Sequence, residues 1–340
     1  MTASPTTGPQ DPPGPASLDS TAQLMTQITA QLSTLLGHVT LSGAPLSGAP
    51  RGDAPDGPPR SAPGGPRPGA PARPARPAAR ARTARPPLPR GLADRPPTLV
   101  AVAHGSRDPR ALRTVTALLA RVRKLRPALP VRLGHVELND PLLSDTLAAL
   151  RGEAVLVPLL LSRGYHVKRD LPDAAAAASH LRTRVAEPLG PHPLLAEALA
   201  TRLAEAGWPA AAPRGAGVVL AAAGSRDPAA GVDTARTAAL LSARLGGVPV
   251  LPGYASAARP TVPEAVAALR AAGRENIAVA SYFTAPGLFA TQCREAAPGL
   301  AADPLGDHPA VARLVLHRYD EAAAALASSP VSHPTVTVGV

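Results

Sequence analysis

The amino-acid sequence predicts an α/β protein made of two tandem homologous domains, each built on a parallel β-sheet. Two observations support this fold class. From residue 98 onward, apolar runs of strand length alternate with segments of helical periodicity, which is the pattern of right-handed βαβ units. The same motifs then recur in the same order about 119 positions later. Residues 1–95 show neither pattern.

The first half begins with a continuous apolar run over residues 98–103, as expected for a strand buried on both faces of a parallel sheet. A His-Gly-Ser-Arg-Asp-Pro turn follows at 104–109, and residues 110–126 place Leu and Val on one helical face. The pattern then continues with predicted strands at 131–138 and 154–161 and predicted helices at 140–150, from 170 onward, and at 193–206. This alternation predicts helices on both faces of the sheet.

The second half repeats three landmarks of the first half. Gly-Ser-Arg-Asp-Pro at 105–109 recurs at 224–228. The other matched pairs are 187–193 with 303–309, and 161–166 with 284–289. Three landmarks in one order at nearly one offset indicate an internal duplication. The predicted parts are an extension at 1–95, a first domain at 96–210, a second domain at 214–328, and a tail at 329–340, with the two domains facing each other across a cleft.

The extension has its own composition. It holds 19 of the 43 prolines, with ten Arg and five acidic residues. Such a segment buries too little apolar surface to offset its ordering entropy, so we expect disorder. Apolar residues at helical spacing over 17–37 predict a short helix, either a docking helix or an isolated, partly formed one. The Arg-rich remainder is either a solvated linker or a weak polyanion-binding segment.

Charge and cysteine content exclude several classes of protein. Residues 96–340 carry 25 Lys and Arg against 19 acidic residues, a moderate excess that suits an anionic small molecule. The sequence lacks zinc-finger spacing and aromatic–basic interleaving, so we expect no specific nucleic-acid partner. A single cysteine, Cys293, excludes a disulfide framework and a self-contained iron–sulfur cluster. Without a signal-peptide pattern or an apolar stretch of about 20 residues, we expect a cytoplasmic protein with no membrane partner.

Two histidines are the candidate metal-handling groups. His104 directly follows the first strand and His166 lies in the turn after another strand, so both are expected at the carboxyl edge of the sheet, where α/β proteins bind ligands. Neutral imidazole binds iron, cobalt and zinc. A lone histidine in a turn is more often a surface or capping residue. However, Ala223 and Phe289 stand at the matching positions of the second half, which favours one active half and one that is structural or walls the site.

Other polar residues cluster around the same turns. Ser106 and Arg107 lie near a helix N-terminus, where backbone N–H groups favour anions. Arg163 and Lys168 flank His166 and form either a solvated basic surface or an anchor for carboxylates. Glu137, at a strand end, either accepts protons or assists metal binding, or it is an ordinary strand-end acid. Structural roles are expected for residues kept in both halves: Gly105, Asp108, and the pair His192 and His308.

Residues 103–109, together with 158–166 and 170–172, resemble the sirohydrochlorin chelatase family of the CbiX/SirB type, and the resemblance extends over 96–328. It implies a chelatase-like α/β fold and a lyase-class metallochelatase that inserts ferrous iron or cobalt into sirohydrochlorin, for sirohaem or cobalamin synthesis. The family's metal-binding histidines fall on His104 and His166. No cofactor is expected beyond the divalent metal that is the substrate.

The chemistry of this substrate suits the residues. Its carboxylates call for a basic rim, so we expect substrate contacts from Ser106, Arg107, Ser162, Arg163 and Lys168. Metal insertion releases two pyrrole protons, for which a histidine or Glu137 is a suitable acceptor. Iron is preferred, with cobalt or nickel as alternatives.

Two other functions and the oligomeric state stay open at this point. The protein could instead be a metal or tetrapyrrole carrier without catalytic activity, or bind polyanions through the extension. Either a monomer whose two domains form the cleft or a weak homo-oligomer is expected.

Overall fold

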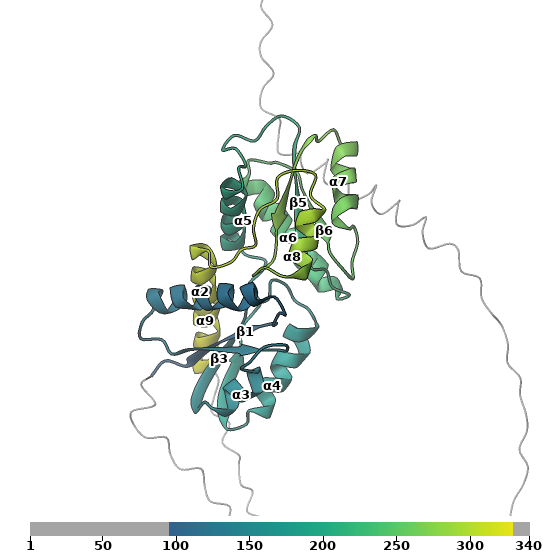
Figure 1. Ribbon diagram of the computed structural model, residues 1–340. Helices are drawn as coiled ribbons and strands as arrows, with labels where there is room; N and C mark the ends of the chain where they lie inside the picture. The colour runs from purple at the N-terminus through teal and green to yellow at the C-terminus, as the bar shows by residue number, and fades with distance from the viewer. Residues whose placement is uncertain (1–94, 329–340) are drawn as a thin grey trace, which may run out of the picture.

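The computed structural model describes residues 95–328, which form two parallel α/β domains, as predicted (Figure 1). The expected helix at 17–37, nearly all of the extension, and the tail at 329–340 lie outside the described residues. All sheet pairings are parallel. Each half begins with the predicted strand, then the predicted turn and a long helix.

The first sheet has the strand order β2-β1-β3-β4. Its strands are β1 (Thr98–Ala103), β2 (Val131–His135), β3 (Gly152–Pro158) and β4 (Leu181–Val185). The helices between them are α2 (Pro109–Leu125), α3 (Leu143–Ala148), α4 (Leu171–Ala177) and a single turn of π-helix, η1 (His166–Asp170). The sequence pattern predicted neither β4 nor η1. β4 is an edge strand that reads Leu-Arg-Thr-Arg-Val, so it lacks the apolar run of a central strand.

The second sheet is smaller, with the order β6-β5-β7. Its strands are β5 (Ala216–Ala222), β6 (Val250–Tyr254) and β7 (Asn276–Ser281), and its helices are α6 (Pro228–Arg244), α7 (Val262–Ala271) and α8 (Leu288–Glu295). In place of a fourth strand, one isolated parallel bridge joins Val279 to Ala301. The second domain therefore keeps the strands that frame the cleft and shortens the outer edge.

Each central strand buries both of its faces, which explains the continuous apolar runs. In β1, Leu99 and Ala101 belong to a cluster with α2 and α9 (Pro309–Ser328), whereas Val100 and Val102 pack with α3 and α4. β5 divides its side chains in the same way between α5 (Pro193–Glu205) with α6 on one face and α7 with α8 on the other. Layers of helix, sheet and helix therefore form in both domains.

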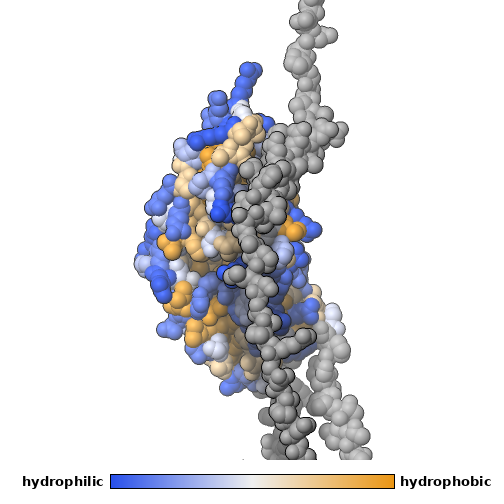
Figure 2. All heavy atoms as spheres, turned by 90° about the vertical axis from the view of Figure 1, so that its right-hand side faces the viewer, coloured by the Kyte–Doolittle hydropathy of each residue, from blue (hydrophilic) through white to orange (hydrophobic). Residues whose placement is uncertain are grey.

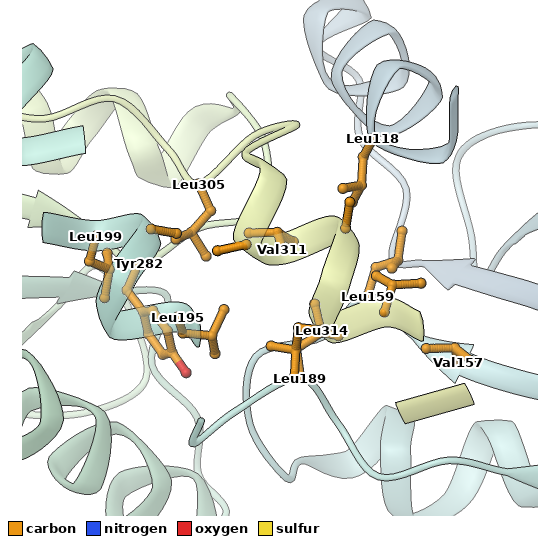
Figure 3. Close-up of a cluster of buried hydrophobic side chains, with 14 of the residues drawn as sticks. Leu118, Val157, Leu159, Leu189, Leu195, Leu199, Tyr282, Leu305, Val311 and Leu314 are labelled. Carbon is orange, nitrogen blue, oxygen red and sulfur yellow. The ribbon is translucent and has the colours of Figure 1, made fainter. Parts of the chain in front are cut away.

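The last helices of the two halves are exchanged. α5 belongs to the first half of the sequence but packs against α6 and β7, whereas α9 belongs to the second half but packs against β3, β4 and α2. Figure 1 shows α5 beside the second sheet and α9 beside the first. One hydrophobic cluster consequently runs through both domains, as Figure 3 shows for Leu118, Leu195 and Val311. This shared core fixes the two sheets relative to each other.

The predicted structural role of His192 and His308 is confirmed, because each caps the exchanged helix of its half. The Nδ1 atoms of these rings accept hydrogen bonds from the backbone N–H groups of Leu194 and Ala310, each at 3.1 Å. Only an unprotonated Nδ1 can accept. Burial lowers the pKa of both histidines, with nearby Arg318 and Arg202 acting in the same direction, so the accepting form is favoured.

The outer surface mixes polar and apolar side chains. On the face shown in Figure 2, hydrophobic residues form small patches between hydrophilic ones. Scattered patches of this kind are ordinary for a folded domain. Among residues 95–328, no helix is long and apolar enough to cross a membrane.

Candidate functional site

A cleft of about 1170 Å³ lies at the carboxyl ends of both sheets. The loops after β1, β2 and β3 form one wall, and the loops after β5, β6 and β7 form the other. β1 and β3 are neighbours whose onward connections run in opposite directions, the first to β2 and the second to β4. A ligand site at such a topological switch point is the rule for open α/β sheets.

His104 and His166 come together in this cleft, as the sequence predicted. His104 follows β1 and His166 begins η1 after β3, so they stand on either side of the switch point. The two ring centroids are 4.7 Å apart and the rings are nearly perpendicular, at 86°. The side chains are 45% and 35% exposed. Both imidazoles are therefore accessible to one small ion.

The turn that carries His104 has a fixed backbone. Gly105 adopts φ +106°, and a Cβ there would lie 1.8 Å from the carbonyl oxygen of Glu137. The N–H of Glu137 donates to the carbonyl of His104 at 3.0 Å. Asp108 caps α2 by accepting from the N–H of Arg110 at 2.9 Å. The predicted roles of Gly105 and Asp108 are thus confirmed, and the same contacts place Glu137 beside His104.

A carboxylate faces Nδ1 of each histidine. Oε1 of Glu137 is 3.5 Å from Nδ1 of His104, and Oδ2 of Asp170 is 2.5 Å from Nδ1 of His166. A carboxylate at Nδ1 favours the tautomer with the proton on that atom, which leaves the Nε2 lone pair available to a metal. Glu137 is 53% exposed, so it can also exchange protons with solvent.

The sequence predicts Asp170 as the beginning of a helix and as part of the segment that carries the family resemblance, but not as a partner of His166. The structure makes it the partner of His166, one turn away in η1. The available signal was the spacing of four residues, because side chains at i and i+4 share a helix face. The spacing of His166 and Asp170 therefore predicts a contact between the two side chains if both lie on a helix.

The second half keeps the backbone conformation of the site but lacks its histidines and carboxylates. Gly224 has φ +90° and the same close approach to a carbonyl, that of Ser256. The residues matching His104, Glu137, His166 and Asp170 are Ala223, Ser256, Phe289 and Cys293. Burial raises the pKa of the Cys293 thiol to about 11, which keeps it neutral. One wall of the cleft thus carries the two imidazoles and the Glu137 carboxylate, and the lining of the other wall has no His, Asp or Glu.

Large apolar side chains are exposed inside the cleft. Leu138 and Tyr165 come from the first half and Leu288 and Phe289 from the second, with exposed fractions from 40% to 68%. Exposed apolar groups gathered in a cleft mark a binding surface more often than scattered ones do. The cleft is therefore suited to a ligand that presents an apolar face beside the two imidazoles.

Ser106, Arg107 and Ser162 line the cleft, and their binding of substrate stays a prediction. Arg107 is exposed and has no ion-pair partner among residues 95–328. The prediction for Arg163 and Lys168 requires correction, because neither lines the cleft. Their charges are paired with the carboxylates of Asp233 and Asp227, both from the second half.

The metal-handling groups are too few for a closed metal site. In the part of the chain that the structure describes, no group of three or more His, Cys, Asp or Glu side chains is arranged to hold a metal ion. A structural zinc site, by contrast, closes a tetrahedron with four protein ligands. Two imidazoles leave coordination positions open, which suits an ion that must be passed on.

Comparison with known proteins identifies the family. The model of the CbiX family matches the chain twice, over residues 98–206 and 217–322. A sirohydrochlorin cobaltochelatase of Methanococcoides burtonii is 27% identical over 123 residues, which is 32% of this chain and 94% of that protein. One from Methanopyrus kandleri is 29% identical over 136 residues, or 32% of this chain and 95% of that protein. Each of these relatives thus matches about a third of the chain, which is roughly the length of one of its two homologous domains.

Solved structures show the same two-domain fold. SirB from Bacillus subtilis with Fe3+ superposes with a TM-score of 0.55 at 23% identity, covering 67% of this chain and 96% of its own. A multi-domain protein of Deinococcus radiodurans with structural similarity to chelatases gives 0.51 at 24% identity, covering 66% of this chain and 55% of its own.

Proposed function

The chain belongs to the CbiX family, and from this premise we propose that it is a sirohydrochlorin chelatase that inserts a divalent metal, ferrous iron in preference to cobalt. One observation carries the proposal: two imidazoles 4.7 Å apart in a 1170 Å³ cleft, facing a wall that presents Leu288 and Phe289. The metal ion is a substrate, and no further cofactor is required. One chain supplies both walls, so a monomer suffices.

In this proposal, His104 and His166 hold the incoming ion through Nε2. Asp170 orients His166 and partly compensates the charge of the ion. The macrocycle then replaces the imidazoles as four metal–nitrogen bonds form, while two pyrrole N–H bonds break. Glu137, half exposed beside His104, accepts these protons and passes them to solvent. A dication enters and two protons leave, so the charge of the complex is unchanged.

The remaining cleft residues seat the macrocycle. Leu288 and Phe289 contact its flat apolar face from the wall opposite the histidines. At the rim, Arg107 and the hydroxyls of Ser106 and Ser162 bind its carboxylates, close to the N-terminus of α2. Truncation of Phe289 to alanine should therefore raise KM for sirohydrochlorin more than it lowers kcat.

The preference for iron is the finer part of the proposal. Imidazole and carboxylate accept iron, cobalt and nickel alike, so the ligands do not decide it. We favour iron, and hence sirohaem synthesis, because the sequence has no His-rich tract or other cobalt-specific feature. The relatives named cobaltochelatases favour the alternative. Anaerobic comparison of kcat/KM for Fe2+ and Co2+ tests the preference. A higher value for Co2+ would overturn it and leave the chelatase activity standing.

The test of the activity is the absorbance of metal-free sirohydrochlorin after addition of Co2+ or Fe2+. Wild-type protein should accelerate insertion, and His104→Ala and His166→Ala should each lower the rate at least about 100-fold. His317→Ala is the matched control, because this half-exposed histidine of α9 lies outside the cleft. Near-normal turnover in both cleft variants would refute the assignment. Binding without acceleration would identify a carrier instead.

A further inference from the structure

The loop that carries His166 is tied to the second half of the chain at two points. Arg163 pairs with Asp233 at 2.7 Å, and Lys168 pairs with Asp227 at 2.5 Å. Both carboxylates belong to the beginning of α6: Asp227 is its N-cap and Asp233 lies in its second turn. These two ion pairs, called the clasp below, bracket His166 in sequence.

The Arg163–Asp233 pair fixes the loop more firmly than a surface pair would. The Asp233 side chain is only 1% exposed. Its oxygens accept from the backbone N–H of Arg163 at 2.9 Å and from the guanidinium at 2.7 to 3.2 Å. Because a buried carboxylate requires a charged and hydrogen-bonded partner, moving the loop away would leave Asp233 uncompensated.

Local packing gives the loop little support of its own. None of the residues His166–Asp170 is buried, and η1 is a single turn. Lys168 also donates its backbone N–H to the carbonyl of Gly164 at 3.0 Å, which links the two ends of the clasp. The position of His166 therefore depends on the contacts with α6 as well as on Asp170.

The duplication supplies an internal comparison, because both cleft loops approach the opposite half equally closely. A Cβ at Gly164 would lie 3.9 Å from Oγ of Ser225, and one at the matching Gly287 would lie 3.7 Å from Oγ of Ser106. The ion pairs are not duplicated. Pro286, Thr291 and Thr114 stand where the first loop and α6 have Arg163, Lys168 and Asp233.

The remaining clasp position confirms the asymmetry. Asp108, the counterpart of Asp227, pairs with Arg110 of its own helix rather than with the opposite half. Of the two equivalent cleft loops within residues 95–328, only the one that carries His166 has ion pairs to the opposite half. General adhesion between the halves would not require this asymmetry.

We propose that the second half acts as a positioning element: through the clasp, Asp227 and Asp233 hold His166 within reach of His104, so that metal affinity depends on α6. The proposal rests on the proposed function, since it assumes that both imidazoles bind the ion. It gives the half without metal ligands a defined part in the reaction.

The test measures Co2+ affinity of the full chain by titration without tetrapyrrole. Lys168→Met removes the exposed arm of the clasp and Arg163→Met the buried arm. Each should raise the Kd for Co2+ about tenfold, as expected for loss of an outer group that orients a ligand. Lys168→Arg should restore wild-type affinity. If Arg163→Met fails to fold, Lys168→Met alone decides the test. The Lys168 side chain is half exposed, so its replacement is not expected to disturb folding.

The matched control is Arg121→Met, which removes a cross-domain ion pair of 2.8 Å with Asp307 outside the cleft. It should leave the Kd for Co2+ unchanged. Clasp variants that bind Co2+ within twofold of wild type would overturn the proposal, as would an equal loss in the control. Tight Co2+ binding that depends on the clasp, without insertion into sirohydrochlorin, would overturn the proposed chelatase activity and leave the clasp standing.

Discussion

Replacing Asp170 with Asn tests the electrostatic support of His166. The Asp170 carboxylate lies 2.5 Å from Nδ1, and the two side chains are 36% and 35% exposed. Asparagine has nearly the same shape and its amide oxygen can still accept from Nδ1–H, so the tautomer is retained. In the wild type, the negative charge of Asp170 strengthens the hydrogen bond and makes Nε2 of His166 a better metal ligand. The substitution removes this charge.

The size of the effect follows from this exposure. Removing an outer-sphere partner of a metal-binding histidine typically costs 10- to 100-fold in affinity. Because the pair is about one-third exposed, solvent screens its charge and the lower end of that range applies. We therefore expect the Kd for Co2+ to rise about tenfold, which corresponds to about 1.4 kcal/mol.

Titration of the full chain with Co2+, followed by absorbance, measures this change directly. Asp173→Asn is the control, since Asp173 lies three residues further along, is exposed, and has no ion-pair partner among residues 95–328. It removes the same charge from the same segment without touching His166. If both variants bind Co2+ equally well, the carboxylate does not support the imidazole and the reasoning fails.

Three further predictions concern stability. Arg163→Met should move the midpoint of urea denaturation to a lower urea concentration, because it leaves the buried Asp233 carboxylate without its partner; an unchanged midpoint would contradict this. Gly105→Ala should cost about 3 kcal/mol and abolish insertion, because a Cβ at φ +106° meets the carbonyl of Glu137; a wild-type Tm would contradict this. Burial lowers the pKa of His308 in the folded protein. The stability that this helix cap contributes is therefore fully present above the unfolded pKa of about 6.5 and is lost as pH falls toward the folded pKa. His308→Asn, which caps without titrating, should therefore flatten the change in Tm between about pH 7 and 5, and an unchanged slope would contradict the cap.

Strand and helix order could be predicted because the central strands are buried on both faces. β1 and β5 read as unbroken apolar runs for that reason. β4 could not, because arginines alternate along this edge strand. The predicted strand at 131–138 ends at His135, since the chain turns at Leu138, which has φ +67°. The exchange of α5 and α9 was also beyond prediction, because an apolar helix face does not specify which sheet it will cover.

The candidate site was predictable to the extent that it follows from topology. His104 and His166 converge because both follow neighbouring strands of one sheet. The partners of Arg163 and Lys168 were not predictable. Both lie on α6, about 60 to 70 residues away, and nothing in the local sequence shows that α6 meets this loop. Contacts across a cleft depend on how two domains dock, which local patterns do not encode.

The most direct test of the central claim is the position of the bound ion. Anomalous diffraction from a crystal of the full chain loaded with Co2+ would locate it. We expect one cobalt in the cleft, about 2.1 Å from a ring nitrogen of both His104 and His166. Cobalt bound to only one of these rings, or only outside the cleft, would contradict the claim that the two imidazoles share the metal.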